Sequence, residues 1–162
     1  FMHPLTGADH LAAMVAVGLW SALAARRAWP DLLAAPLAFA GMLLVGALMG
    51  LTGLQLPAVE PMIAASLLVL GLLVATRIHL PAGVAVAVVG LFAVFHGVAH
   101  GQELAGEQGA AITLAGMVAA TLVLHAAGIA AGWALRHANA WLPRVAGAGV
   151  LGLGVALLAQ AA

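Results

Sequence analysis

Cysteine, lysine and tyrosine are absent from this chain of 162 residues, and each absence excludes a kind of chemistry. Without cysteine the protein has no disulfide bond, no thiolate metal site and no cysteine nucleophile. Without lysine it has neither the phosphate-binding P-loop motif nor a residue for Schiff-base chemistry. An ATP-driven pump of the P-loop type is therefore excluded for this chain alone.

Charge is scarce as well. Only 6% of the residues are charged, whereas 65% are apolar and the mean hydropathy is +1.19. Ordinary soluble domains carry roughly 25% charged residues, and so few charges cannot cover the surface of a soluble protein. The formal net charge is zero and no basic patch is present, so nucleic acid is not an expected partner. The chain is predicted to be an all-α integral membrane protein embedded in a lipid bilayer.

Charges and prolines divide the chain into six apolar stretches, each near the roughly 20 residues that span a bilayer. The stretches are continuous and lack the alternation of a membrane β-barrel. Their connections are short and no linker marks a second domain, so residues 1–162 are expected to form a single transmembrane helical domain. The six predicted helices cover residues 8–26, 33–52, 61–76, 82–103, 110–135 and 142–161.

The arginines predict how this bundle is oriented. All five lie at the connections that follow the first, third and fifth predicted helices, while Glu60, Glu103 and Glu107 lie at the other connections. The positive-inside rule places the arginine-bearing connections in the cytoplasm and both termini in the periplasm. Helices one to three and four to six would then form a 3+3 inverted repeat, as in many secondary transporters, although the halves share no convincing sequence similarity. The arginines are Arg26, Arg27, Arg77, Arg136 and Arg144.

Glycine is abundant, with 20 residues, and three pairs have the GxxxG spacing of close helix contacts. These pairs are Gly46–Gly50, Gly97–Gly101 and Gly128–Gly132. In a chain so rich in glycine and alanine such spacings also arise by chance. Either reading stays open, and a contact within a homo-oligomer is one of them.

Two polar clusters interrupt the apolar pattern. The first opens the chain in "HPLTGADH", and the second closes the fourth predicted helix in "FHGVAHGQE". At 100° per residue the histidines and the glutamate of the second cluster share one helix stripe. Because the first helix begins outside and the fourth ends outside, both clusters are expected on the same side of the membrane. The candidate residues are His3, Asp9, His10, His96, His100 and Glu103.

Four imidazoles and two carboxylates suit borderline divalent metals such as nickel, cobalt, zinc and copper. The carboxylates would balance the two positive charges of an ion that loses water in a medium of low dielectric. Histidine must be deprotonated to bind, so occupancy is expected to fall at low pH. Ionisable residues inside membranes are costly and usually functional, so the sequence predicts a metal site at the outer side.

Three further residues have two readings each. Met14 lies one turn after His10 and is either an additional ligand or a packing residue. His125, near the middle of the fifth predicted helix, is either a second station along an ion path or a buried histidine bonded to a neighbour. If Phe1 is the mature first residue, its amine, two backbone amides and His3 would suit square-planar Ni²⁺ or Cu²⁺. Residues upstream of Phe1 would abolish that array.

The two motifs also resemble a known family. "HPLTGADHLAAMVAVG" (3–18) is similar to the signature of the HupE/UreJ family of nickel and cobalt permeases, and "FHGVAHGQE" (95–103) resembles that family's second polar motif. The resemblance implies a multi-pass protein of the bacterial inner membrane, made with a cleaved signal peptide and linked to the nickel enzymes hydrogenase or urease. It implies secondary uptake of Ni²⁺, in some members Co²⁺, without a bound cofactor. The ion would be handled by His3, Asp9, His10, His96, His100 and Glu103, none of which departs from the motifs.

Two other functions remain open on the residues alone. A membrane electron carrier could bind haem through His10 and His96, although adjacent carboxylates suit a divalent ion better. An intramembrane metallohydrolase could activate water on Zn²⁺ with Glu103 or Asp9 as the base. The predicted function is that of a permease and not of an enzyme.

Overall fold

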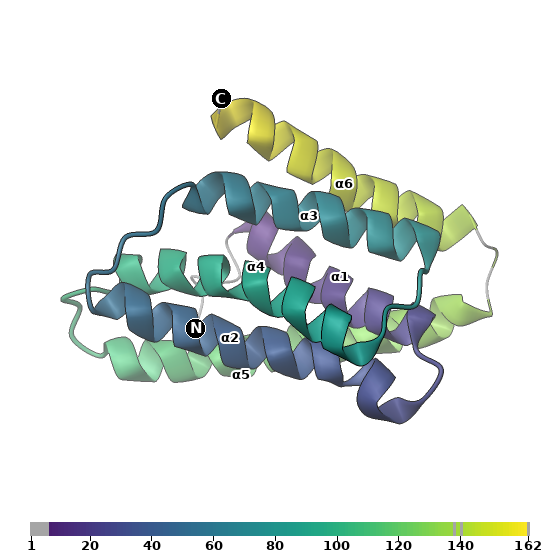
Figure 1. Ribbon diagram of the computed structural model, residues 1–162, viewed down its shortest axis with the longest axis horizontal. Helices are drawn as coiled ribbons and strands as arrows, with labels where there is room; N and C mark the ends of the chain where they lie inside the picture. The colour runs from purple at the N-terminus through teal and green to yellow at the C-terminus, as the bar shows by residue number, and fades with distance from the viewer. Residues whose placement is uncertain (1–6, 138, 140, 162) are drawn as a thin grey trace.

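The computed structural model describes residues 7–137, 139 and 141–161, and the regular structure of this part of the chain is entirely helical (Figure 1). A short kinked segment, η2 (Ala28–Leu32), in which Trp29 has an extended backbone, separates the first two α-helices. The predicted helix ends agree with the observed ones to within two residues. The α-helices are α1 (Ala8–Ala24), α2 (Ala34–Leu51), α3 (Val59–Thr76), α4 (Ala82–Glu103), α5 (Ala110–Arg136) and α6 (Trp141–Ala161).

Five of these helices, α2 to α6, are long and apolar enough to cross a membrane. The remaining helix, α1, is apolar but has only 17 residues. This architecture fits a multi-pass membrane protein.

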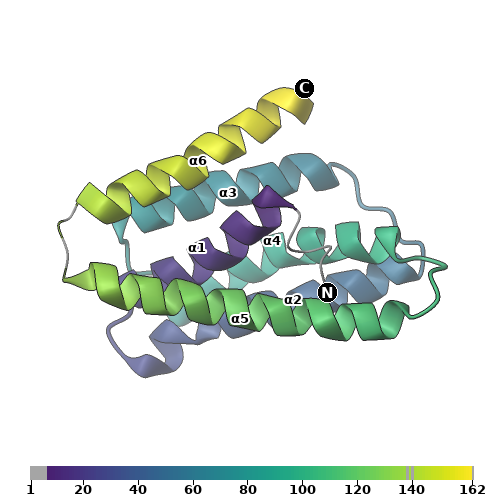
Figure 2. The same cartoon turned by 180° about the vertical axis from the view of Figure 1, so that it is seen from behind.

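The helix connections alternate between the two ends of the bundle (Figures 1 and 2). The connections after α1, α3 and α5 lie together at one end, which we call the arginine end. Hydrogen bonds join them there, because the indole of Trp20 donates to the backbone oxygen of Ile78 at 2.9 Å and the guanidinium of Arg136 donates to that of Ala25. The connections after α2 and α4 lie at the opposite end, which we call the glutamate end.

Helices α1 and α5 pack closely through glycine, as do α2 and α4. A Cβ atom added to Gly18 of α1 would lie 2.2 Å from the carbonyl oxygen of His125 in α5. One added to Gly97 of α4 would lie 2.1 Å from the carbonyl oxygen of Leu43 in α2. Both distances are far below van der Waals contact, so only glycine lets these backbones approach.

The same two pairs of helices match at further positions. A Cβ atom on Gly128 would lie 2.3 Å from the carbonyl oxygen of Val15, and one on Gly46 would lie 2.2 Å from that of Val94. Gly97 and Val94 of α4 follow Gly18 and Val15 of α1 by the same number of residues. His125 and Gly128 of α5 likewise follow Leu43 and Gly46 of α2 by one constant number of residues. The packing of α1 on α5 therefore corresponds, residue by residue, to the packing of α4 on α2.

The third close pair is α3 and α6, and α6 packs along α3 at one lateral edge of the bundle (Figure 2). Here Gly71 and Gly147 face each other, because a Cβ atom on either would lie within 2.7 Å of the carbonyl oxygen of the other. The three GxxxG pairs of α2, α4 and α5 are buried in contacts within the chain. They therefore pack helices of one molecule against each other.

Candidate metal site

Three histidines from two helices meet inside the bundle. His10 lies near the start of α1, while His96 and His100 lie one turn apart near the end of α4. The ring of His10 has its centroid 4.8 Å from that of His96 and 4.3 Å from that of His100. All three are buried, with exposures of 9%, 0% and 5%. The described part of the first polar cluster therefore lies beside the second, although some 90 residues separate the two in the chain.

His10 and His100 each have a carboxylate beside them. The Nδ1 atom of His10 lies 3.1 Å from Oδ1 of Asp9, and Nδ1 of His100 lies 3.4 Å from Oε2 of Glu103. A carboxylate accepts the hydrogen bond, so Nδ1 carries the proton and the lone pair of His10 is on Nε2. That Nε2 atom is buried and has no hydrogen-bond partner among the described residues. A carboxylate that orients an imidazole in this way is the usual outer neighbour of a metal-binding histidine.

His96 is oriented by a hydroxyl group. Ser66 of α3 donates its proton to the carbonyl oxygen of Ile63 at 2.6 Å, so its oxygen accepts from Nε2 of His96 at 2.9 Å. The lone pair of His96 is then on Nδ1, which is buried without a partner in the described part of the chain. Sequence reasoning missed Ser66. Its only signal is a hydroxyl group in an otherwise apolar span, where it can bond a neighbouring helix.

The rings pack against one another in this conformation. Across residues 7–137, 139 and 141–161, no three histidine, aspartate or glutamate side chains are spaced to hold one metal ion. The planes of His10 and His100 are inclined at 49° and their rings are in contact. An ion that bound between them would have to separate or turn these rings. Two candidate residues from the sequence, His3 and Phe1, lie outside the described residues.

The site lies below the surface of the glutamate end. His10 is only two residues into α1, yet it contacts His96, which is seven residues from the end of α4. Counted from these two residues at 1.5 Å per residue, α1 begins about 7 Å below the end of α4.

A cavity bordered by two glutamates lies where α4 ends and α5 begins. It has a volume of about 310 Å³ at the glutamate end, and Glu103 borders it while also contacting His100. Carboxylates around an opening raise the local concentration of cations. The cavity is lined by Glu103, Leu104, Glu107, Gln108 and Thr113.

Deeper in the bundle, His125 and Met14 are neighbours. Nδ1 of His125 donates to the backbone oxygen of Met14 at 2.8 Å, and the Met14 sulfur lies 3.5 Å from Oγ1 of Thr121. All three residues are buried. His125 is thus bonded to a neighbour through one ring nitrogen, whereas its Nε2 atom has no partner among the described residues.

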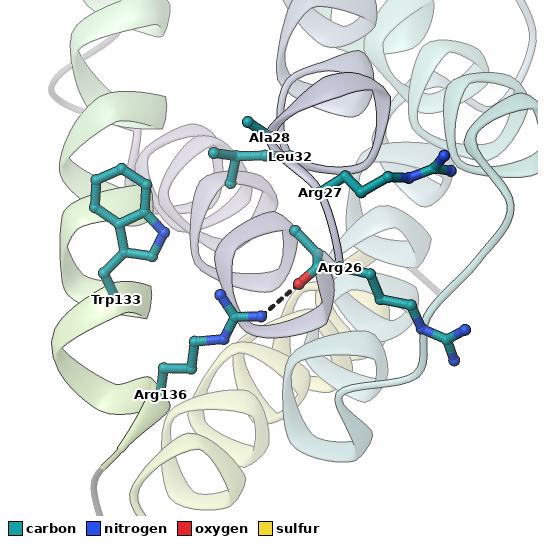
Figure 3. Close-up of a pocket in the computed structure, with 7 residues that line it drawn as sticks. Arg26, Arg27, Ala28, Leu32, Trp133 and Arg136 are labelled. Carbon is teal, nitrogen blue, oxygen red and sulfur yellow. Dashed lines mark hydrogen bonds between the residues drawn. The ribbon is translucent and has the colours of Figure 1, made fainter.

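The arginine end has the opposite electrostatic character. A cavity of about 160 Å³ there is lined by residues that include Arg26, Arg27, Arg136 and Trp133. In Figure 3 the Arg136 side chain is directed at the backbone oxygen of Ala25, whereas the side chains of Arg26 and Arg27 point away from Trp133. Three guanidinium groups repel a metal cation. Asp31 lies at this end too, but it is paired with Arg27 at 3.6 Å. The described residues that the sequence predicts as ligands lie at the glutamate end and in the middle of the bundle.

Comparison with known proteins agrees with the motifs. The family model described as HupE / UreJ protein matches residues 1–157. The chain is 43% identical over 158 residues to Protein HupE of Rhizobium leguminosarum bv. viciae, an alignment that covers 96% of this chain and 81% of that protein. No solved structure gives a significant match. The chain belongs to the HupE/UreJ family.

Proposed function

We propose that this protein is a permease that takes up Ni²⁺, with Co²⁺ as the second candidate ion, across the bacterial inner membrane. The observation that carries the proposal is the buried contact of His10 with His96 and His100. Membership of the HupE/UreJ family supports it. Buried imidazoles beside carboxylates form a donor set for a borderline divalent ion.

The ion enters from the glutamate end. Glu103 and Glu107 attract it into the acidic cavity, and the buried histidines replace its water with nitrogen ligands. Asp9 and Glu103 supply the negative charge that makes a bare divalent ion tolerable in the bundle. His3 belongs to the same ion-handling set by its place in the first motif.

The arginine end faces the cytoplasm in this proposal, and both termini face the periplasm. A membrane potential that is negative inside favours entry of a divalent cation by about 4–5 kcal/mol per 100 mV, at roughly 2.3 kcal/mol per charge. Uptake therefore needs no ATP. The ion must also leave, so the site has to bind it only moderately well.

Inverted repeats provide the framework for movement. The matched glycine contacts of α1 on α5 and of α4 on α2 support a repeat of helices one to three in helices four to six. By the same offset His96 corresponds to Val17 and His100 to Ser21, both buried toward the arginine end. The two halves would share packing but not ligands, and rocking of one against the other would give alternating access.

The geometry argues against the haem alternative. Two axial imidazoles must stand on opposite faces of a macrocycle, whereas the centroids of His10 and His96 are 4.8 Å apart with their rings in direct contact. The metallohydrolase alternative shares the ligands of the permease. It is separated from the permease by its product, because hydrolysis leaves a cleaved substrate and transport does not.

The test is flux of radiolabelled Ni²⁺ into proteoliposomes that carry an inside-negative potential. We expect uptake by the natural protein and loss of most of it in His10→Ala and in His100→Ala. His137→Ala is the control, because His137 is exposed in the turn at the arginine end. If both site variants transport like the natural protein, the proposal is wrong.

A further inference from the structure

His125 is a buried histidine in which only one of the two ring nitrogens has a hydrogen-bond partner among the described residues. It lies in α5 with 2% of its surface exposed, and Nδ1 donates to the backbone oxygen of Met14 at 2.8 Å. A carbonyl oxygen can only accept, so the proton is on Nδ1 and the lone pair on Nε2. Nε2 has no hydrogen-bond partner in the described part of the chain. A buried acceptor without a partner is costly, and in a membrane bundle it marks a functional position.

Phe39 connects this histidine to the outer site. Its ring, fully buried in α2, has its centroid 5.5 Å from that of His96 and 5.3 Å from that of His125. His96 also has an unpartnered nitrogen, Nδ1. One aromatic ring therefore contacts two imidazoles, each of which has one ring nitrogen without a hydrogen-bond partner among the described residues.

His125 lies deeper in the bundle than His10, on the side of the arginine end. Met14, whose backbone holds His125, is one helical turn after His10 on α1, or about 6 Å deeper at 1.5 Å per residue. His125 itself is fifteen residues beyond Ala110, the start of α5 at the glutamate end. An ion that passed from His96 to His125 would move toward the arginine end.

We propose that His125 is a second ion station, which receives the divalent cation from the outer histidines when the ring of Phe39 swings aside. The proposal rests on the permease function argued above and deepens it. Nε2 of His125 is the ligand, and the hydroxyl group of Thr121 and the sulfur of Met14 lie in the same layer. These three side chains are neutral, so they hold the ion less tightly than the outer site with Asp9 and Glu103. Weaker binding suits a station from which the ion leaves.

The test separates Ni²⁺ binding from Ni²⁺ flux. His125→Asn is the principal variant, because its side-chain amide keeps a donor for the Met14 oxygen and removes Nε2. We expect the purified variant to bind Ni²⁺ at the outer site with an affinity within about threefold of the natural protein, by equilibrium dialysis. We expect its flux into proteoliposomes to fall about tenfold or more, the range typical for loss of a group that supports a metal site. Size-exclusion chromatography and helical circular dichroism verify that it is folded.

Two further variants make the result decisive. Leu124→Asn places the same amide at the adjacent position of α5, where the side chain is only partly buried, and it is expected to keep its flux. His125→Gln, which restores a polar atom near the place of Nε2, is expected to recover part of the flux. If His125→Asn and His125→Gln both carry Ni²⁺ within twofold of the natural protein, the second station is wrong while the permease stands. If the natural protein neither binds nor carries Ni²⁺, the permease proposal fails, and the station fails with it.

Discussion

Nε2 of His96 donates a hydrogen bond to Oγ of Ser66 at 2.9 Å, across the contact between α4 and α3. Both residues are fully buried, so no water competes for this bond. The bond selects the tautomer of His96 that leaves Nδ1 able to bind a metal ion. The orientation of one proposed ligand thus depends on a helix that contributes no ligand itself.

Replacement of Ser66 by alanine removes this acceptor. Ser66→Ala is expected to weaken Ni²⁺ binding about 10- to 100-fold, the range for loss of a group that orients a metal ligand. Isothermal titration calorimetry on purified protein measures the change. Ser21→Ala is the matched control, because Ser21 is also buried but lies toward the arginine end. Equal affinity in the two serine variants would show that Ser66 does not position His96.

The close approach of α2 and α4 predicts a second result. Gly97→Ala places a Cβ atom 2.1 Å from the carbonyl oxygen of Leu43, so the two helices must separate. Overpacking of this kind lowers the free energy of unfolding by about 1–3 kcal/mol, and a backbone atom cannot move aside as a flexible side chain can. Gly149→Ala has no atom within 4 Å of its new Cβ and is expected to leave stability unchanged or slightly raised. Thermal unfolding in detergent measures both variants.

The proposed repeat extends that prediction to α1. Gly18 occupies on α1 the place of Gly97 on α4, so Gly18→Ala is expected to destabilise the protein by a similar amount. If Gly18→Ala unfolds at the same midpoint temperature as Gly149→Ala, the two helix pairs are not equivalent.

The absence of cysteine makes the orientation of the bundle directly measurable. Single cysteines at Ala105, exposed at the glutamate end, and at His137, exposed at the arginine end, give one label on each side. We expect a membrane-impermeant maleimide to label Ala105→Cys in intact spheroplasts, and His137→Cys only after lysis. The reverse pattern would place the arginine end outside and overturn the direction of uptake.

The sequence by itself determined the number and the bounds of the helices, because apolar length, prolines and charges are local properties of the chain. It also determined that all arginine-bearing connections share one end, since successive helices of a bundle reverse direction. That alternation was enough to predict that the motifs containing His10 and His96 lie on the same side. The spacing of His96, His100 and Glu103 likewise predicted their common stripe.

Only the tertiary structure decided which residues of different helices are in contact. The depth of α1 relative to α4, the bond that His96 donates to Ser66, and the contact of Phe39 with two imidazoles depend on segments far apart in the chain. Helix topology suggested an inverted repeat, but the residue-by-residue match of α1 on α5 with α4 on α2 needed the structure, because it repeats backbone approaches at glycine while the surrounding side chains differ. Hydropathy and charge determine which residues enter the membrane, whereas close packing between helices determines which of them meet.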